Sequence, residues 1–326
     1  MPRKVALAGL ARTGLEYLDV LLDGDLFEVV AVADSDPAVL RERDMPGSIS
    51  VYEDYRSLIV ESALAGLDLL VVATEPYQSA EFLPLAVDRG ISVFHKPPFA
   101  RSLQEGRSLV ARFEAADCPF LIAREWHRDG WPTDAETLAN RAGHVFTAMG
   151  QIATGDEPGG WRGDSVRAGG GVLLNGAYAQ VDLLVTLLGL PASVYAVCSF
   201  ARAPGETLNY DTEDTAILLM RWGSDRSATL VARRGVMPGA WQVTLVGTSD
   251  TLVWPTVSSG DDEDGHDEQS TAGIAFQIRS AAGIFETVVR RSDLTARDHL
   301  ATLAVIEAAY LSAKTGAPEV PARLPG

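Results

Sequence analysis

The first residues that could do chemistry form a glycine-containing turn near the N-terminus. The segment Gly9-Leu10-Ala11-Arg12-Thr13-Gly14 directly follows the apolar run Val5–Ala8 and precedes a segment with helical periodicity. A tight turn from a strand into a helix presents backbone N–H groups and a helix N-terminus to a pyrophosphate. An alanine stands at the middle glycine of the usual G-x-G-x-x-G spacing, where its methyl group crowds the phosphate. The predicted cofactor contacts here are Gly9, Ala11, Arg12, Thr13 and Gly14.

A carboxylate follows the second apolar run of the chain. Asp34 comes directly after Val29–Ala33 and twenty residues after Gly14. In this position a carboxylate accepts hydrogen bonds from the ribose hydroxyls of a dinucleotide and repels a 2′-phosphate. Ser35, a further predicted contact, and Asp36 follow without an adjacent Lys or Arg, so NAD is favoured over NADP. The alternative is that Asp34 caps a helix.

Lys96 is the candidate for handling a proton. It follows the apolar run Ile91–Phe94 and precedes Pro97 and Pro98, which fix its backbone. A lysine in a closed cleft loses solvation, so its pKa falls from about 10 towards neutrality and its amine can hydrogen-bond a reacting alcohol oxygen. The alternative is a surface lysine at the end of a strand.

Short apolar runs alternate with helical segments over residues 1–123. Such runs, apolar on both faces and separated by helices, predict a doubly wound parallel sheet in an α/β Rossmann domain. The predicted strands are Val5–Ala8, Val29–Ala33, Leu69–Ala73, Ile91–Phe94 and Phe120–Ala123. One predicted helix between them is Ser102–Ala116.

The pattern changes over residues 124–326 and predicts an α+β domain with a mostly antiparallel sheet. Its predicted strands are His144–Ala153, Ser193–Arg202, Asp214–Trp222, Ala228–Arg234, Trp241–Gly247, Thr251–Trp254 and Gly273–Arg279. Its predicted helices are Gly171–Leu188 and Arg297–Lys314. The acidic run Gly260–Glu268 is expected to be a solvated loop without metal-ligand spacing.

Composition narrows the possible partners. The 326 residues include 27 basic and 44 acidic side chains, which give a net charge of −17. This charge repels phosphate backbones and anionic membranes, so we expect neither nucleic acid nor a membrane as a partner. Cys118 and Cys198 lack Cys or His neighbours at metal-ligand spacing, and we expect no metal. Polar residues interrupt the most apolar stretch, Gly171–Leu190, so we expect a soluble, cytoplasmic protein.

Six motifs along nearly the whole chain carry a resemblance. They are Leu67–Thr74, Gly90–Pro97, Trp161-Arg162 with Gly169–Leu174, Glu213–Ala216, Val246–Thr248 and Ser312–Gly316. In this order they resemble the Gfo/Idh/MocA family, the relatives of glucose–fructose oxidoreductase and inositol dehydrogenase. The resemblance implies a secondary alcohol of a sugar-, cyclitol- or polyol-like small molecule as substrate, and homodimers or homotetramers formed through the open C-terminal sheet. It also implies cofactor contacts at Thr74, Lys96 and Pro97, with the nicotinamide beside Lys96.

The chain departs from the family at its second catalytic element, an Asp-x-x-x-His helix. Asn175 and Ala179 stand at these two positions, and His95 replaces the Glu before the Lys-Pro motif. Tyr178, three residues after Asn175 on a helix, could project into the cleft as a substitute acid or base, given a cation nearby. A core tyrosine is the alternative. The predicted substrate contacts are Lys96, Arg128, Trp161, Arg162, Asn175 and Tyr178.

Three functions are compatible with these residues. The first is an NAD-dependent oxidoreductase in which Lys96, with or without Tyr178, handles the proton. The second is a catalytically silent regulatory protein that binds NAD or a sugar. The third is a reaction in which internal redox precedes elimination or hydrolysis and NAD is recycled in place.

Overall fold

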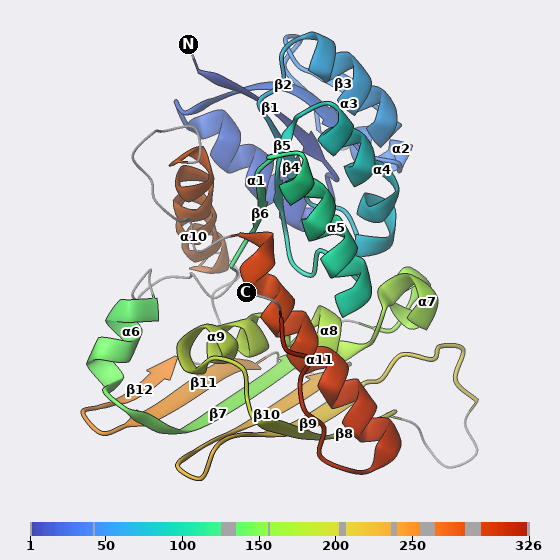
Figure 1. Ribbon diagram of the computed structural model, residues 1–326. Helices are drawn as coiled ribbons and strands as arrows, with labels where there is room; N and C mark the ends of the chain where they lie inside the picture. Colours follow the sequence, from blue (N-terminus) through green and yellow to red (C-terminus); the bar gives the residue numbers. More distant parts are fainter. Residues whose placement is uncertain are drawn as a thin grey trace. The chain divides into compact units, whose positions relative to one another are not determined.

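The computed structural model describes residues 2–41, 43–124, 135–155, 157–201, 207–235, 240–254, 265–283 and 295–324 (Figure 1). The chain divides into two compact units. The first unit comprises Met1–Ala100, Gln104–Glu125 and Asp267–Asp298. The second unit comprises Arg101–Leu103, Trp126–His266 and His299–Gly326. Each unit is built around its own sheet of six strands.

The first unit contains a wholly parallel sheet with the strand order β3-β2-β1-β4-β5-β6. The strands are β1 (Arg3–Ala8), β2 (Phe27–Ala33), β3 (Ser50–Tyr52), β4 (Leu69–Val72), β5 (Ser92–His95) and β6 (Phe120–Ile122). The strands β4, β5 and β6 are buried along their whole length, as expected for a parallel sheet covered on both faces. The Rossmann architecture is confirmed, and only β3, which is three residues long, was not predicted.

Six helices belong to this sheet in the described part of the first unit. They are α1 (Arg12–Asp23), α2 (Pro37–Arg41), α3 (Tyr55–Leu64), α4 (Pro76–Asp88), α5 (Leu103–Ala115) and α10 (Gly265–Ala282). The side chains Ile274, Ile278 and Ala281 of α10 pack into the same core as Leu18 of α1 and Val29 of β2. Their spacing of four and three residues is that of a helix face.

The helix α10 corrects two predictions. The segment Gly273–Arg279, predicted as a strand of the second domain, is helical, because its buried positions follow a period near 3.6 rather than 2. Since α10 returns to the first unit, residues 124–326 do not all belong to the second. Of the acidic run Gly260–Glu268, predicted as a loop, residues 260–264 lie outside the described residues and 265–268 begin α10.

The second unit contains a mixed sheet with the order β12-β11-β7-β10-β9-β8, in which only β7 and β10 pair in parallel. The strands are β7 (Val145–Thr154), β8 (Ser193–Ser199), β9 (Thr215–Trp222), β10 (Arg226–Arg234), β11 (Ala240–Gly247) and β12 (Thr251–Trp254). The helical segments are α6 (Ala135–Ala142), η1 (Gly160–Gly163), α7 (Ser165–Ala168), α8 (Val172–Asn175), α9 (Tyr178–Leu188) and α11 (Ala296–Thr315). The mostly antiparallel α+β character predicted for this region is confirmed.

The predicted helix Gly171–Leu188 is broken in the middle. The helix α8 ends at Asn175, α9 begins at Tyr178, and the segments on either side of the break are bent by 59°. Gly176 lies at the break, and glycine is the poorest helix former after proline. Asn175 and Tyr178 therefore lie on two different helices, and the prediction that they share one helix is wrong. In the described part of the chain, no single helix is long and apolar enough to cross a membrane, and only this bent pair passes by length and composition.

One face of the second sheet carries α8, α9 and α11 (Figure 1). The other face carries exposed apolar side chains. Strand pairing places a row of residues across all six strands, Val253, Thr244, Met149, Thr229, Leu219 and Tyr195. The four largest apolar members of this row are between 39% and 50% exposed. In the next row along, Val197 and Ile217 are exposed as well. The sheet thus has an apolar face that no described helix covers.

Removing side-chain volume from α10 should destabilise the first unit. We expect Ile278→Ala to lower the free energy of unfolding by about 2–4 kcal/mol, because Ile278 is 4% exposed and leaves a cavity in the shared core. Arg279→Ala, an exposed neighbour on the same helix, is the control. Urea unfolding followed by circular dichroism measures both variants, and equal stabilities would contradict the packing of α10 on this core.

Candidate cofactor and substrate sites

Sheet register brings the predicted cofactor residues of the first unit into one line. Ala8 pairs with Ala33 and with Val72, and Val72 pairs with His95, so these four residues form a row across the sheet. Each is followed by a residue at the carboxyl edge. Those residues are Gly9, Asp34, Ala73 and Lys96. Ligands of open parallel sheets bind outside this edge, so the row is the candidate dinucleotide site.

The glycine turn is closely packed against β4. Gly9 has φ +92°, and a Cβ there would lie 2.9 Å from the backbone of Ala73 and Thr74. A Cβ on Gly14 would lie 2.0 Å from the carbonyl oxygen of Gly9. Ala11 has φ −60° and ψ 174°, which any residue adopts, and it is exposed, so the alanine causes no backbone strain. Among the described residues no side chain caps α1, and its first turn contains no acidic residue, so this helix end suits a pyrophosphate.

The carboxylate of Asp34 is fixed from two sides. Its Oδ2 accepts a hydrogen bond of 2.6 Å from Leu10 N–H, and its Oδ1 accepts one of 2.9 Å from Asp36 N–H. Each oxygen keeps a lone pair for a further donor. The helix α2 is capped by Asp36, which accepts from the N–H of Ala38 at 2.8 Å. The capping role that was the alternative for Asp34 thus belongs to its neighbour.

A neutral histidine precedes the candidate catalytic lysine. His95 is fully buried, and burial lowers its pKa to about 3. Its Nδ1 hydrogen-bonds the carbonyl oxygen of Lys96, and because a carbonyl only accepts, Nδ1 carries the proton. Lys96 is half-buried, and its backbone N–H donates to Val72 at 2.9 Å. The group that replaces the Glu before Lys96 is therefore uncharged.

The amide of Asn175 in the second unit is oriented by backbone carbonyls. Its Nδ2 donates to the carbonyl of Gly170 at 2.8 Å, and the carbonyls of Ala168 and Gly171 lie at 3.4 Å. Its Oδ1 is buried and has no hydrogen-bond partner within the described residues. An ionised carboxylate at this position would face the same carbonyl oxygens and could not donate a hydrogen bond to them. The surrounding loop therefore accommodates an amide rather than an ionised Asp.

Tyr178 lies in a buried polar cluster. Its side chain is 2% exposed, and its hydroxyl is 3.2 Å from Nδ1 of His299, whose ring stacks on it at 6.0 Å. The same Nδ1 lies 3.3 Å from Asp182, which accepts a hydrogen bond of 2.9 Å from Thr302. Sequence reasoning missed His299 and Thr302 because they are about 120 residues away on α11, with no spacing that signals the contact. Ala179 is buried next to Tyr178.

The triple glycine before α8 makes room for Glu213. This carboxylate accepts from the N–H groups of Gly171 at 2.7 Å and Leu173 at 2.9 Å, and so caps the helix. Tyr310 donates to Glu213 at 2.9 Å, and a Cβ on Gly170 would lie 2.1 Å from the Tyr310 hydroxyl. Burial raises the pKa of Glu213. The glycines and Glu213 together thus determine where α8 begins.

A buried ion pair anchors the segment that contains Trp161 and Arg162. Arg234 contacts Asp214 at 2.6 Å, with both side chains almost fully buried. Thr212 and Arg234 donate to the carbonyl oxygen of Arg162 at 2.7 and 3.3 Å. The guanidinium of Arg162 lies 4.7 Å from the ring centroid of Trp161. These two predicted substrate residues are thus adjacent, whereas Arg128 lies outside the described residues.

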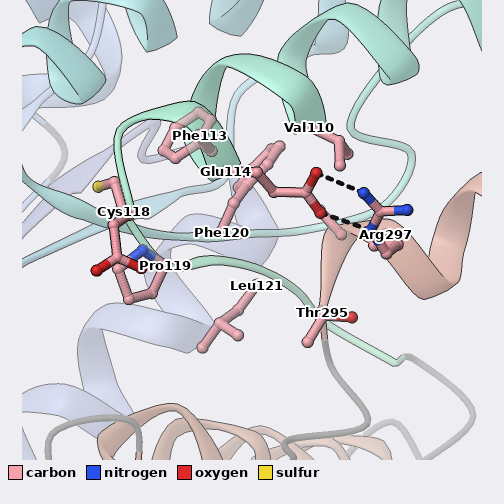
Figure 2. A pocket seen from close by; sticks show the side chains of 11 residues that line it. Val110, Phe113, Glu114, Cys118, Pro119, Phe120, Leu121, Thr295 and Arg297 are labelled. Atoms are coloured by element: carbon pink, nitrogen blue, oxygen red, sulfur yellow. Dashed lines mark hydrogen bonds and ion pairs between the residues drawn. The ribbon is translucent and has the colours of Figure 1, made fainter. Parts of the chain in front are cut away.

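The remaining reactive side chains of the described residues form neither a metal site nor a reactive thiol. In the part of the chain that the structure describes, no three His, Cys, Asp or Glu residues gather as a metal site. Burial raises the pKa of Cys118 to about 11 and that of Cys198 to about 12, so neither is a reactive thiol. A cavity of about 370 Å³ beside the Glu114–Arg297 ion pair, shown in Figure 2, lies where β6 begins, at the opposite edge of the sheet from the row.

Two family models match the chain. One, described as an oxidoreductase family with an NAD-binding Rossmann fold, matches residues 3–123. The other, described as the GFO/IDH/MocA C-terminal domain, matches residues 138–253.

Individual relatives extend over most of the chain. A D-apiose dehydrogenase of Paraburkholderia graminis is 24% identical over 96% of this chain and 88% of its own length. A putative UDP-kanosamine synthase oxidoreductase subunit of Amycolatopsis mediterranei is 29% identical over 58% of this chain, and the match spans about half of that protein, 52%. The solved structure of GenD2 from gentamicin A biosynthesis, in complex with NAD, has 18% identity and a TM-score of 0.83 over 98% of this chain and 96% of that one.

The structural likeness shows a shared fold. The two family models together cover both sheets and the glycine turn. The chain therefore belongs to the Gfo/Idh/MocA family of oxidoreductases.

Proposed function

We propose that this protein is an NAD-dependent oxidoreductase that acts on a secondary alcohol of a sugar-, cyclitol- or polyol-like small molecule. The observation that carries the proposal is the row formed by the glycine turn, Asp34 and Lys96 at one sheet edge. A dinucleotide bound along this row accepts hydride through its nicotinamide. The relatives named as a D-apiose dehydrogenase and a UDP-kanosamine synthase subunit support a sugar-like substrate.

Asp34 supports NAD rather than NADP as the cofactor. Its two oxygens are oriented by Leu10 and Asp36 and keep lone pairs for the 2′- and 3′-hydroxyls of a ribose. A 2′-phosphate would bring a second negative charge next to this carboxylate. Arg12 and Thr13, at the start of the uncapped helix α1, are the proposed contacts of the pyrophosphate.

Lys96 is the proposed proton acceptor. When an alcohol carbon loses hydride, the oxygen keeps a proton that a base must accept as the carbonyl forms. The ring of His95 next to Lys96 is neutral, whereas the Glu of the family motif would place a negative charge there. Asn175, Trp161 and Arg162 are proposed to orient the substrate through hydrogen bonds and stacking.

The catalytically silent alternative is favoured by one observation in the second unit. Asn175 and Ala179 cannot ionise, and the hydroxyl of Tyr178 is directed at His299 inside the unit. Proton transfer would then depend on Lys96 alone. If Lys96 does not act as a base, the same row binds NAD without turnover.

We also propose that the apolar face of the second sheet joins two or four copies of this chain. Its row of exposed side chains is continuous across the sheet, and contiguous apolar surface of this kind marks association sites. A two-fold axis at such a face lets the same residues contact one another in both copies.

Replacing Asp34 should weaken NAD binding. We expect Asp34→Ala to raise the dissociation constant for NAD about 10- to 100-fold, because the ribose hydroxyls lose two hydrogen-bond acceptors in the protein. The difference in affinity between NAD and NADP should become smaller as well. Calorimetric titration with both dinucleotides measures this. Asp36→Ala, which changes the adjacent exposed carboxylate, should bind NAD almost normally. Equal affinity for NAD in both variants would contradict the assignment of Asp34.

Lys96→Met separates catalysis from binding. With a polyol or sugar substrate we expect kcat to fall at least about 100-fold while the affinity for NAD stays within about three-fold. The matched variant is Lys4→Met, at the opposite edge of the sheet. An unchanged kcat in Lys96→Met would exclude Lys96 as the base. Tight NAD binding by the wild-type protein without turnover of any substrate would favour the silent alternative.

A charge on the apolar face should separate the subunits. We expect Leu219→Lys to convert a dimer or tetramer into a 34.8 kDa monomer, because the new charge would be buried at the interface. Leu311→Lys, an exposed position on α11, should leave the assembly intact. Light scattering after gel filtration measures both masses. An assembly that survives Leu219→Lys, or a monomeric wild type, would contradict the proposed interface.

A further inference from the structure

We propose that Tyr55 and Gln78 are positioning residues that hold the hydroxyl of Ser35 as a hydrogen-bond donor to the adenosine half of the dinucleotide. Ser35 follows Asp34 at the tip of β2, Tyr55 is the first residue of α3, and Gln78 lies in the first turn of α4. The inference rests on the proposed function, since it concerns the same cofactor edge.

The hydrogen bonds around Ser35 assign its proton. Its Oγ accepts from Gln78 Nε2 at 3.2 Å and from the Tyr55 hydroxyl at 3.4 Å. Its backbone N–H donates to the Tyr55 oxygen at 3.2 Å. A serine hydroxyl has two acceptor lone pairs and one proton, so both lone pairs are used and the proton is left to donate. Ser35 is exposed, so a ligand can reach that proton.

The Tyr55 side chain is fixed as a donor. Burial raises the pKa of Tyr55 to about 12, so the phenol keeps its proton at neutral pH. Its ring packs on Phe82 of α4, with centroids 5.0 Å apart. The hydroxyl therefore stays beside Ser35 without help from solvent. Two helices that pack on each other thus supply the two donors that orient one serine.

The arrangement fits an adenosine better than a bare phosphate. Asp34 offers two oriented acceptors, and Ser35 offers one oriented donor in the next residue. A ribose and its attached purine present both hydroxyl donors and oxygen or ring-nitrogen acceptors within a short distance. The carboxylate would repel an isolated phosphate.

A double-mutant cycle tests whether Tyr55 acts through Ser35. The probe is ADP-ribose, titrated calorimetrically into wild type, Ser35→Ala, Tyr55→Phe and the double variant. We expect each single change to weaken ADP-ribose binding about three- to ten-fold, the effect of one hydrogen bond. The double variant should bind no more weakly than Ser35→Ala alone, since residue 35 then has no hydroxyl for Tyr55 to orient. Gln78→Ala should behave like Tyr55→Phe.

Tyr52→Phe is the matched control, because the Tyr52 hydroxyl bonds Glu61 at 3.0 Å rather than Ser35. It should bind ADP-ribose like the wild type. Effects of Ser35→Ala and Tyr55→Phe that multiply in the double variant would overturn the proposal, as would unchanged binding in Ser35→Ala. A wild-type protein that binds neither ADP-ribose nor NAD would instead refute the proposed function itself.

Discussion

The hydrogen bond from Leu10 N–H to Asp34 is the interaction on which the candidate cofactor site depends. It joins the tip of β2 to the glycine turn after β1 at 2.6 Å, so the group proposed for ribose and the group proposed for pyrophosphate are held in one geometry. The parallel register supports this link, because Ala8, Ala33, Val72 and His95 are paired in one row. A hydrogen bond to a charged acceptor is stronger than one to a neutral acceptor, so the carboxylate holds the glycine turn and the tip of β2 in a fixed geometry.

The two units use their polar residues differently. In the first unit the functional groups lie at the sheet edge, and the residues behind them, His95 and Tyr55, are kept neutral by burial. In the second unit the motif residues Glu213 and Asp214 are occupied inside the fold, the former capping α8 and the latter pairing with Arg234. Motifs that mark the family thus include residues whose side chains bond to other groups within the fold.

The elements that depend on the local sequence pattern could be predicted. All eleven strands predicted outside Gly273–Arg279 overlap observed strands, because each contains an apolar run. The short β3 was not predicted, since its three mostly exposed residues carry little periodicity. The α10 prediction failed because a short apolar segment does not reveal which unit it packs on. The break at Gly176 and the contact of Tyr178 with His299 depend on tertiary packing, so the spacing of Asn175 and Tyr178 gave a misleading geometry.

The proposed function requires that one adenine dinucleotide binds along the row of the first unit. Calorimetric titration of the wild-type protein with NADH, in the presence and absence of saturating ADP-ribose, tests it most directly. We expect one NADH to bind per chain, and we expect binding to be lost when ADP-ribose occupies the adenosine end. Absence of NADH binding, or binding that ADP-ribose leaves unchanged, would contradict it.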